Sequence, residues 1–226
     1  LMLRRMKDEV LKDLPPKRKI VVPMNVDAVE MKNYEQASFQ FFEWIKSHMD
    51  AGMEAQTNID RLKQLAYLAK RNSIIQWIEQ YLESGNKLVV GTYHKNAIED
   101  LMLHFKKIAV KIDGGVTGKR RQEAVDVFQK DEKVRLIICQ ILTVSGLTLT
   151  AAPATCTVEF CWSPSEHVQF EDRVHRIGQE ADSVTAYYLI APGTIEEDCM
   201  AMVNNKFNVV NKIIDGKETS DIFEDS

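Results

Sequence analysis

The sequence lacks several features that would direct it to particular compartments or chemistries. No apolar run approaches the length needed to span a membrane, and charges occupy the N-terminus where a signal peptide needs an apolar core. The four cysteines show no C-x-x-C spacing, so we expect buried free thiols in a reducing compartment. No Ser/His/Asp or Cys/His arrangement stands out, and neither His94 nor His104 has neighbours suited to binding a metal. These absences favour a cytoplasmic or a nuclear protein.

The net charge is also small. It is −4 over 226 residues, so global charge does not indicate a nucleic-acid binder, and any such contact must come from local basic patches. The first nineteen residues hold seven Lys/Arg and three Asp/Glu, which fits either a solvated end or a basic patch. The last twelve hold five acids and one lysine, which we interpret as a solvated tail.

A phosphate-binding loop of the usual kind is missing as well. The run 113–121 (DGGVTGKRR) comes near it, but three residues separate Gly114 from Gly118 where a P-loop has four, and Arg120 follows Lys119 where Ser or Thr is needed. We interpret this run instead as a turn after a strand, followed by the basic start of a helix. Its backbone N–H groups and cationic side chains would suit a nucleic-acid phosphate. A plain solvated turn is the alternative.

What the sequence does have is an arginine-bearing segment at 169–179 (QFEDRVHRIGQ). Arg173 and Arg176 are three residues apart, and Gln169 lies one turn upstream, so on a helix the three side chains would share one face. Pro164 provides a helix start and Gly178 a stop. Guanidinium groups in this arrangement suit a phosphate chain, because each donates parallel hydrogen bonds and keeps its charge.

The order of apolar segments predicts the fold class. A short strand near 19–23 precedes three helical stretches, at 27–50, around 62–69 and at 74–82. Strands and helices then alternate, with strands at 87–91, 108–112, 134–139, 155–160 and 184–190, and helices at 95–105, 117–130, 164–178 and about 194–214. Near-continuous apolar strands alternating with helices indicate an α/β fold with a parallel sheet covered on both faces.

The arginine segment resembles the last conserved motif of the Swi/Snf-type ATPases, within superfamily two of helicases and translocases, which reads Gln-x-x-x-Arg-x-His-Arg-Ile-Gly-Gln. The spacing from Gly146 to Gln169 also matches that family, including the run 149–152 (LTAA). Gly114, Arg121 and Gln122 match a further family segment. Residues 3–17 are similar to the segment that joins the family's two lobes, and the run 171–176 leans toward the annealing-helicase-like branch.

The chain departs from the family pattern at three places. Residues 139–144 (CQILTV) occupy the place where the family has a run of small, glycine-rich residues. Glu159 takes the position of the usual acid before the tryptophan, and Ser163 takes the position of an asparagine. Because of these departures, two interpretations of the 143–152 loop stay open: it either binds a ligand or is a capped turn. Trp162 is either a base-stacking platform or, as we favour, a packing residue, and we expect His175 to orient its helix by a hydrogen bond.

The resemblance implies a RecA-like helicase C-terminal lobe with an N-terminal helical insertion and a long C-terminal helix. It implies that Arg173 and Arg176 act as arginine fingers on ATP. The residues implied for ATP binding are Gly146, Gln169, Arg173 and Arg176, and those implied for DNA binding are Thr92, Gly115, Lys119, Arg121 and Thr143. The expected partners are double-stranded DNA and a first ATPase lobe, which would hold most of the ATP and Mg²⁺.

The expected organisation has four parts: a linker and first strand at 1–24, a helical segment at 25–85, the RecA-like lobe at 86–192, and a helix with an acidic tail at 193–226. No Asp-Glu-x-His box is present, so we expect this chain alone to hydrolyse ATP negligibly. The location would be nuclear in a eukaryote and cytoplasmic, at the nucleoid, in a prokaryote or virus. The alternatives are a non-catalytic helicase-like binding module and an RNA-directed helicase, whose arginine motif is spaced differently.

Overall fold

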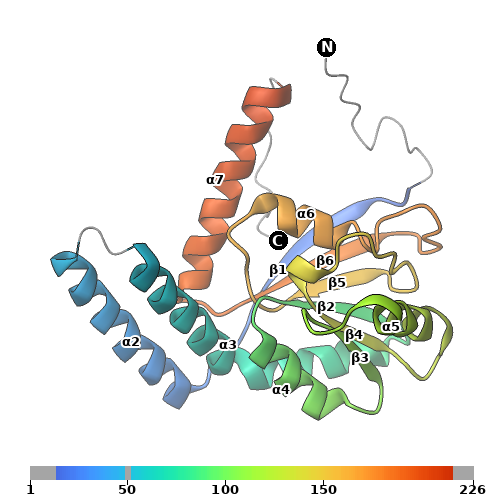
Figure 1. The fold of residues 1–226 in the computed structure, drawn as a ribbon, viewed down its shortest axis with the longest axis horizontal. Helices are drawn as coiled ribbons and strands as arrows, with labels where there is room; N and C mark the ends of the chain where they lie inside the picture. The colour runs from blue at the N-terminus through green and yellow to red at the C-terminus, as the bar shows by residue number, and fades with distance from the viewer. Residues whose placement is uncertain (1–13, 49–51, 216–226) are drawn as a thin grey trace.

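A six-stranded, all-parallel sheet forms the centre of the chain (Figure 1). The computed structural model describes residues 14–48 and 52–215, without the side chains beyond Lys206. The strands are β1 (Lys17–Pro23), β2 (Leu88–Thr92), β3 (Ala109–Ile112), β4 (Leu136–Gln140), β5 (Ala154–Thr157) and β6 (Val184–Ile190). Their order across the sheet is β1-β6-β5-β2-β4-β3. The predicted α/β class is therefore confirmed, whereas the basic segment before residue 14 and the acidic tail lie outside the described residues.

The helices are α2 (Ala28–Ser47), α3 (Gly52–Glu83), α4 (Lys95–Phe105), α5 (Gly118–Lys130), α6 (Pro164–Glu171) and α7 (Ile195–Asp215), with a short 3₁₀ turn, η1 (Ile141–Thr143). One prediction was wrong: the two helical stretches around 62–69 and 74–82 are a single helix, α3. No glycine or proline interrupts 70–73, so the helix continues while its packing partner changes. Ala66 packs against α2, and Ile74 and Ile78 pack against the sheet.

Helices cover both faces of the sheet. On one face Leu88 and Val90 of β2 pack with α3 and α4, and on the other Val89 packs with α5 and α6, as the alternation of side chains along a strand requires. Gly91 lies under α6, where a Cβ atom would come within 2.6 Å of the Phe170 ring. The missing side chain at this position lets α6 approach the sheet closely.

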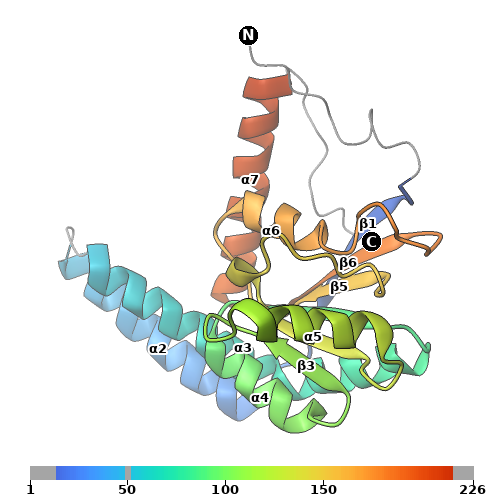
Figure 2. The same ribbon diagram turned by 45° about the vertical axis from the view of Figure 1, so that its right-hand side comes forward.

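Two helical elements extend away from the sheet. Figure 1 shows α2 beside the first half of α3, an antiparallel pair that projects to one side. Figure 2 shows α7 rising away from the strands. The start of α7 is anchored by an ion pair between Lys70 and Glu196, whose Nζ and Oε2 atoms are 2.6 Å apart and fully buried. Among the described helices, none is long and apolar enough to cross a bilayer.

Candidate ATP- and DNA-binding site

Three residues expected at DNA lie at one edge of the sheet. Thr92 ends β2, Gly115 follows β3, and Thr143 ends η1 directly after β4. Because β2, β4 and β3 are neighbours and parallel, their carboxyl ends meet at this edge, which is where open α/β sheets bind ligands. Thr92, however, has no exposed surface, and its hydroxyl donates to the His94 carbonyl oxygen at 3.3 Å. The Thr92 side chain therefore holds the turn after β2 and is not presented at the surface.

The two basic residues of this edge have different roles. Lys119, in the first turn of α5, has a side chain that is 91% exposed, with Glu123 3.9 Å away. Arg121 instead points back, and its guanidinium donates to the carbonyl oxygens of Thr143 and Ser145. Arg121 thus fixes the loop after β4, while Lys119 is free to contact a solvated anion.

The arginine segment does not form the expected continuous helix. Helix α6 ends at Glu171, and Arg173 and Arg176 lie in the turns that follow, at 172–179, which we call the arginine turn. Arg173 Nε donates to the Gln169 carbonyl oxygen at 2.7 Å, and Arg176 Nε donates to that of Asp172 at 3.0 Å. In a continuing helix each of these carbonyls would accept from the backbone N–H of the same arginine. The two side chains take over those bonds and cap the end of α6, which is why the shared helical face is lost.

The two arginines also differ in exposure. Arg173 is 6% exposed, its Nη1 lies 3.4 Å from the Leu147 carbonyl oxygen, and burial, together with the charge of Arg176, lowers its pKa. Arg176 is half-buried, and its Nη1 lies 3.5 Å from the Thr148 hydroxyl. Without rearrangement, Arg176 is the guanidinium that a bound phosphate could reach more easily.

Gly146 and Gln169 lie close to these elements. Gly146 is exposed and has a φ of +79°, a conformation that favours glycine. Gln169 is exposed and lines a hollow of about 210 Å³ between α6 and η1, together with Val144, Ser145 and Glu166.

The connection between β4 and β5, residues 141–153, joins the two sets of predicted residues. Arg121 binds it at Thr143 and Ser145, and the arginine turn binds it at Leu147 and Leu149, where the Leu149 N–H donates to the Arg173 carbonyl oxygen at 2.8 Å. The sheet edge that carries the predicted DNA-binding residues and the turn that carries the predicted ATP-binding arginines are therefore joined by one continuous set of hydrogen bonds.

Two polar residues to which the sequence reasoning assigned no role also hold this region. Glu159, 1% exposed, accepts from the backbone N–H groups of Tyr93 and His94, both at 2.9 Å. Lys63 is 2% exposed, donates to the Phe160 carbonyl oxygen at 2.7 Å and lies 4.9 Å from the Trp162 ring. The interpretation of Trp162 as a packing residue is confirmed, since its side chain packs against the buried cluster that includes Phe160 and Tyr188.

A second missed group surrounds Glu171. Its carboxylate oxygens lie 2.8 Å from the Nζ atoms of Lys17 and of Lys19, and His175 Nε2 lies 2.8 Å from the Pro15 carbonyl oxygen. His175 thus makes a hydrogen bond as expected, but it lies in the arginine turn, not in a helix, and its bond holds that turn to the segment before β1. More than 150 residues of sequence separate these partners, so no local pattern could reveal the contacts.

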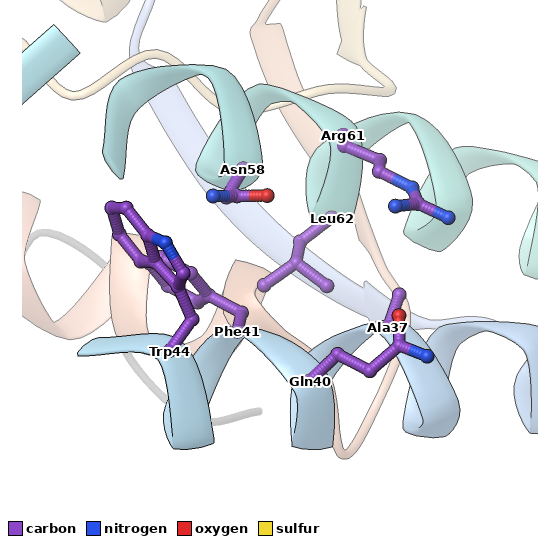
Figure 3. Close-up of a pocket in the computed structure, with 7 residues that line it drawn as sticks. All are labelled: Ala37, Gln40, Phe41, Trp44, Asn58, Arg61 and Leu62. Carbon is purple, nitrogen blue, oxygen red and sulfur yellow. The ribbon is translucent and has the colours of Figure 1, made fainter. Parts of the chain in front are cut away.

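The remaining candidates take no part in this site. All four cysteines are free and buried, as expected, and burial raises the pKa of Cys199 to about 12. No group of His, Cys, Asp or Glu that could hold a metal ion occurs among the residues described. A hollow of about 280 Å³ between α2 and α3, bordered by Phe41, Trp44 and Arg61, includes none of the predicted site residues (Figure 3).

Several known proteins are similar to this chain. The model of the helicase conserved C-terminal domain matches residues 69–178. DNA annealing helicase and endonuclease ZRANB3 of Homo sapiens is 33% identical over 225 residues, which cover 96% of this chain and 21% of that protein. This chain belongs to the Swi/Snf-type helicase C-terminal domains.

Other members of the Swi/Snf group support the same assignment. SWI/SNF-related matrix-associated actin-dependent regulator of chromatin subfamily A-like protein 1 of Xenopus tropicalis is 31% identical, over 94% of this chain and 23% of that protein. The structure of the Sulfolobus solfataricus SWI2/SNF2 ATPase core in complex with dsDNA has a TM-score of 0.70 and 23% identity, and it covers 96% of this chain and 50% of that chain. This similarity confirms the RecA-like fold. The chain spans about a fifth of the length of the curated relatives it matches.

Proposed function

We propose that this chain is the second lobe of an ATP-dependent double-stranded DNA translocase of the Swi/Snf type. In this proposal a first lobe holds most of the ATP and the Mg²⁺, and the arginine turn completes the site across the gap between the lobes. The supporting observation is that the 141–153 connection is hydrogen-bonded both to the arginine turn and to Arg121 at the expected DNA edge. A change at either place can therefore reach the other.

The arginines would act on the γ-phosphate. Arg176 is half-buried and has its Nε bonded to a carbonyl, which fixes the side chain, while Nη1 makes only a long contact of 3.5 Å with the Thr148 hydroxyl. Arg173 would first have to release the Leu147 carbonyl. Fixed guanidinium groups stabilise the charge that develops during phosphoryl transfer, which is worth roughly 10³–10⁵ in rate for arginine fingers. Gln169 and Gly146 would border the same nucleotide.

On the DNA side, Lys119 would contact the phosphate backbone. The N–H groups of Gly115 and Val116 already donate to Asp113, so Gly115 would border the DNA and hold the turn in shape. Contacts of this kind position a protein on a duplex without reading its sequence, as a translocase requires. Thr143 and Arg121 would act by fixing the loop between the two sites. ATP-driven closing and opening of the lobes would then move the DNA edge along the duplex.

The experiment is a measurement of ATP hydrolysis in the protein that contains both lobes. We expect Arg176→Ala to reduce DNA-stimulated turnover by roughly 10³-fold or more, with nucleotide binding nearly unchanged. The same protein without the first lobe should bind DNA weakly and hydrolyse no ATP. Near-normal turnover by Arg176→Ala would reject the assignment of Arg176 as a finger.

One observation favours a second candidate function. Arg173 is buried, and its Nε and Nη1 atoms are committed to backbone carbonyls, which suits a structural role. In a helicase-like lobe that binds nucleic acid or protein without hydrolysing ATP, Arg173 would need only this structural role. It predicts that the two-lobed protein binds DNA but shows no DNA-stimulated turnover, so the wild-type measurement separates the two functions.

A further inference from the structure

We propose that Lys17, Lys19 and Glu171 form a link through which the segment leading into β1 positions the arginine turn. The inference rests on the proposed function, because it assigns these residues to the placement of Arg173 and Arg176. None of the three would touch ATP, so they are positioning residues.

The link is a compact set of charged groups. Glu171, the last residue of α6, has a side chain that is 1% exposed. Lys17 Nζ lies 2.8 Å from its Oε2, Lys19 Nζ lies 2.8 Å from its Oε1, and the Tyr188 hydroxyl donates to the same carboxylate. Lys17 also lies 3.5 Å from Asp172, the first residue of the arginine turn. Both carboxylate oxygens are therefore committed to strands β1 and β6.

Backbone contacts run beside the charged ones. Pro15 accepts a hydrogen bond from His175, which lies between the two arginines, with a distance of 2.8 Å to Nε2. Pro16 accepts one from the Val184 N–H at 2.9 Å, at the start of β6. Two consecutive residues before β1 thus hold the arginine turn and the strand that follows it.

The chemistry of the link suits positioning better than stability. Buried ion pairs are often no more stabilising than apolar groups of the same volume, because both charges lose their hydration. Such pairs do fix the orientation of the two side chains, since each nitrogen must face one carboxylate oxygen. Glu171 is followed at once by the turn that carries the arginines, so a displacement of β1 would move its carboxylate and the residues attached to it.

In a two-lobed protein the chain would reach β1 through Pro15 and Pro16. A shift of that segment on lobe closure would act on Glu171 and His175 together, on either side of Arg173. Errors of about 1 Å in the placement of a catalytic group can cost roughly 10²-fold in rate. The link would therefore affect the chemical step and leave ground-state nucleotide affinity unchanged.

The test uses the two-lobed protein with Glu171→Gln and Lys17→Met. Glu196→Gln is the matched control, because it removes the carboxylate of a buried ion pair in the same lobe, between α3 and α7. We expect the first two variants to lower kcat by about 10-fold to 10²-fold with little change in KM for ATP. Glu196→Gln should lower the melting temperature and leave kcat unchanged at temperatures where all variants are folded.

Two further measurements keep the test decisive. Lys17→Arg, which keeps the charge, should retain most of the activity that Lys17→Met loses. Hydrogen exchange should show reduced protection at 172–179 in Glu171→Gln and not in Glu196→Gln. Equal losses of kcat in Glu171→Gln and Glu196→Gln, tracking the melting temperature, would overturn the link.

The outcomes also separate this inference from the function on which it rests. If Arg176→Ala is inactive while Glu171→Gln retains wild-type kcat, the link is rejected and the proposed function stands. If Arg176→Ala and Arg173→Ala both keep near-normal turnover, the finger assignment is rejected and the link with it, because there is then no finger to position.

Discussion

The arginine turn and the first turn of α5 both present cationic side chains, but in opposite ways. Arg173 is 6% exposed and hydrogen-bonded to two carbonyls, and Arg176 is bonded at Nε, whereas the Lys119 side chain is 91% exposed. A group that must meet a developing charge gains from being held in place, because it then needs no reorganisation during the reaction. A group that follows a repeating phosphate backbone needs only its charge and can adapt its position.

The difference extends to the surroundings of each region. The turn is held by Glu171 and by a segment more than 150 residues away in sequence, so its geometry depends on the whole lobe. The loop that leads into the first turn of α5 is held locally: the Gly115 N–H donates to Asp113 at 2.8 Å, and Lys111 lies 3.0 Å from the same carboxylate. The hydrogen bond of Lys111 offsets the burial of Asp113, and the net effect is a lowered pKa. Perturbations of the core should therefore affect the turn far more than the loop.

The largest effect should come from acid. Burial alone would raise the pKa of Glu171, but Lys19 and Lys17 outweigh it and lower the value from 4.5 to about 2. The stability contributed by this lowered pKa is present above pH 4.5 and is lost as the pH falls from 4.5 toward 2. A shift of this size corresponds to about 3 kcal/mol at most.

The measurement is the difference in free energy of unfolding between the wild type and Glu171→Gln. It should shrink as the pH falls through this window, because only the wild type has this group to protonate. A difference that stays constant down to pH 2 would show that the link does not favour the ionised carboxylate.

A smaller effect is expected from filling the space under α6. In Gly91→Ala the new Cβ would meet the Phe170 ring at 2.6 Å and Ile141 at 2.9 Å, so either α6 or η1 must shift. We expect a loss of about 1–3 kcal/mol in the free energy of unfolding, as for other overpacked cores. Gly114→Ala is the control, since the nearest atom beyond its chain neighbours, Gln140 Oε1, would be 3.9 Å away, and chemical denaturation of both variants compares the two regions directly. A loss in Gly91→Ala no larger than in Gly114→Ala would contradict the close contact.

The smallest effect is expected in the first turn of α5. Lys119→Glu should weaken DNA binding by about 1 kcal/mol and reduce the salt dependence of the binding constant by about one charge or more. Folding should not change, because the side chain is solvated. Lys107→Glu makes the same charge change at an exposed site between α4 and β3, and it should have less effect. An unchanged salt slope in Lys119→Glu would exclude the contact.

The limits of sequence reasoning are clearest at α3 and α6. Helix 95–105 and strand 184–190 were predicted at their observed bounds, because each has a regular apolar period and a clear start and stop. Helix α3 was predicted as two separate helices, because its apolar face packs against different elements along its length. The end of α6 was placed about seven residues too late, because the residues after Glu171 keep a helical spacing although their arginine side chains have displaced the backbone bonds.

By itself, the sequence determined the parallel α/β fold, the family and the presence of two arginines beside a loop of matching spacing, because these depend on local periodicity and on motifs within short runs. The tertiary structure alone decided how those arginines are presented: one buried, one half-buried, in a turn held by Lys17, Lys19 and Pro15 from the far end of the chain. The reason is physical. Ion pairs and hydrogen bonds between distant segments form only once the sheet has brought β1 beside β6, and nothing in either segment alone specifies its partner.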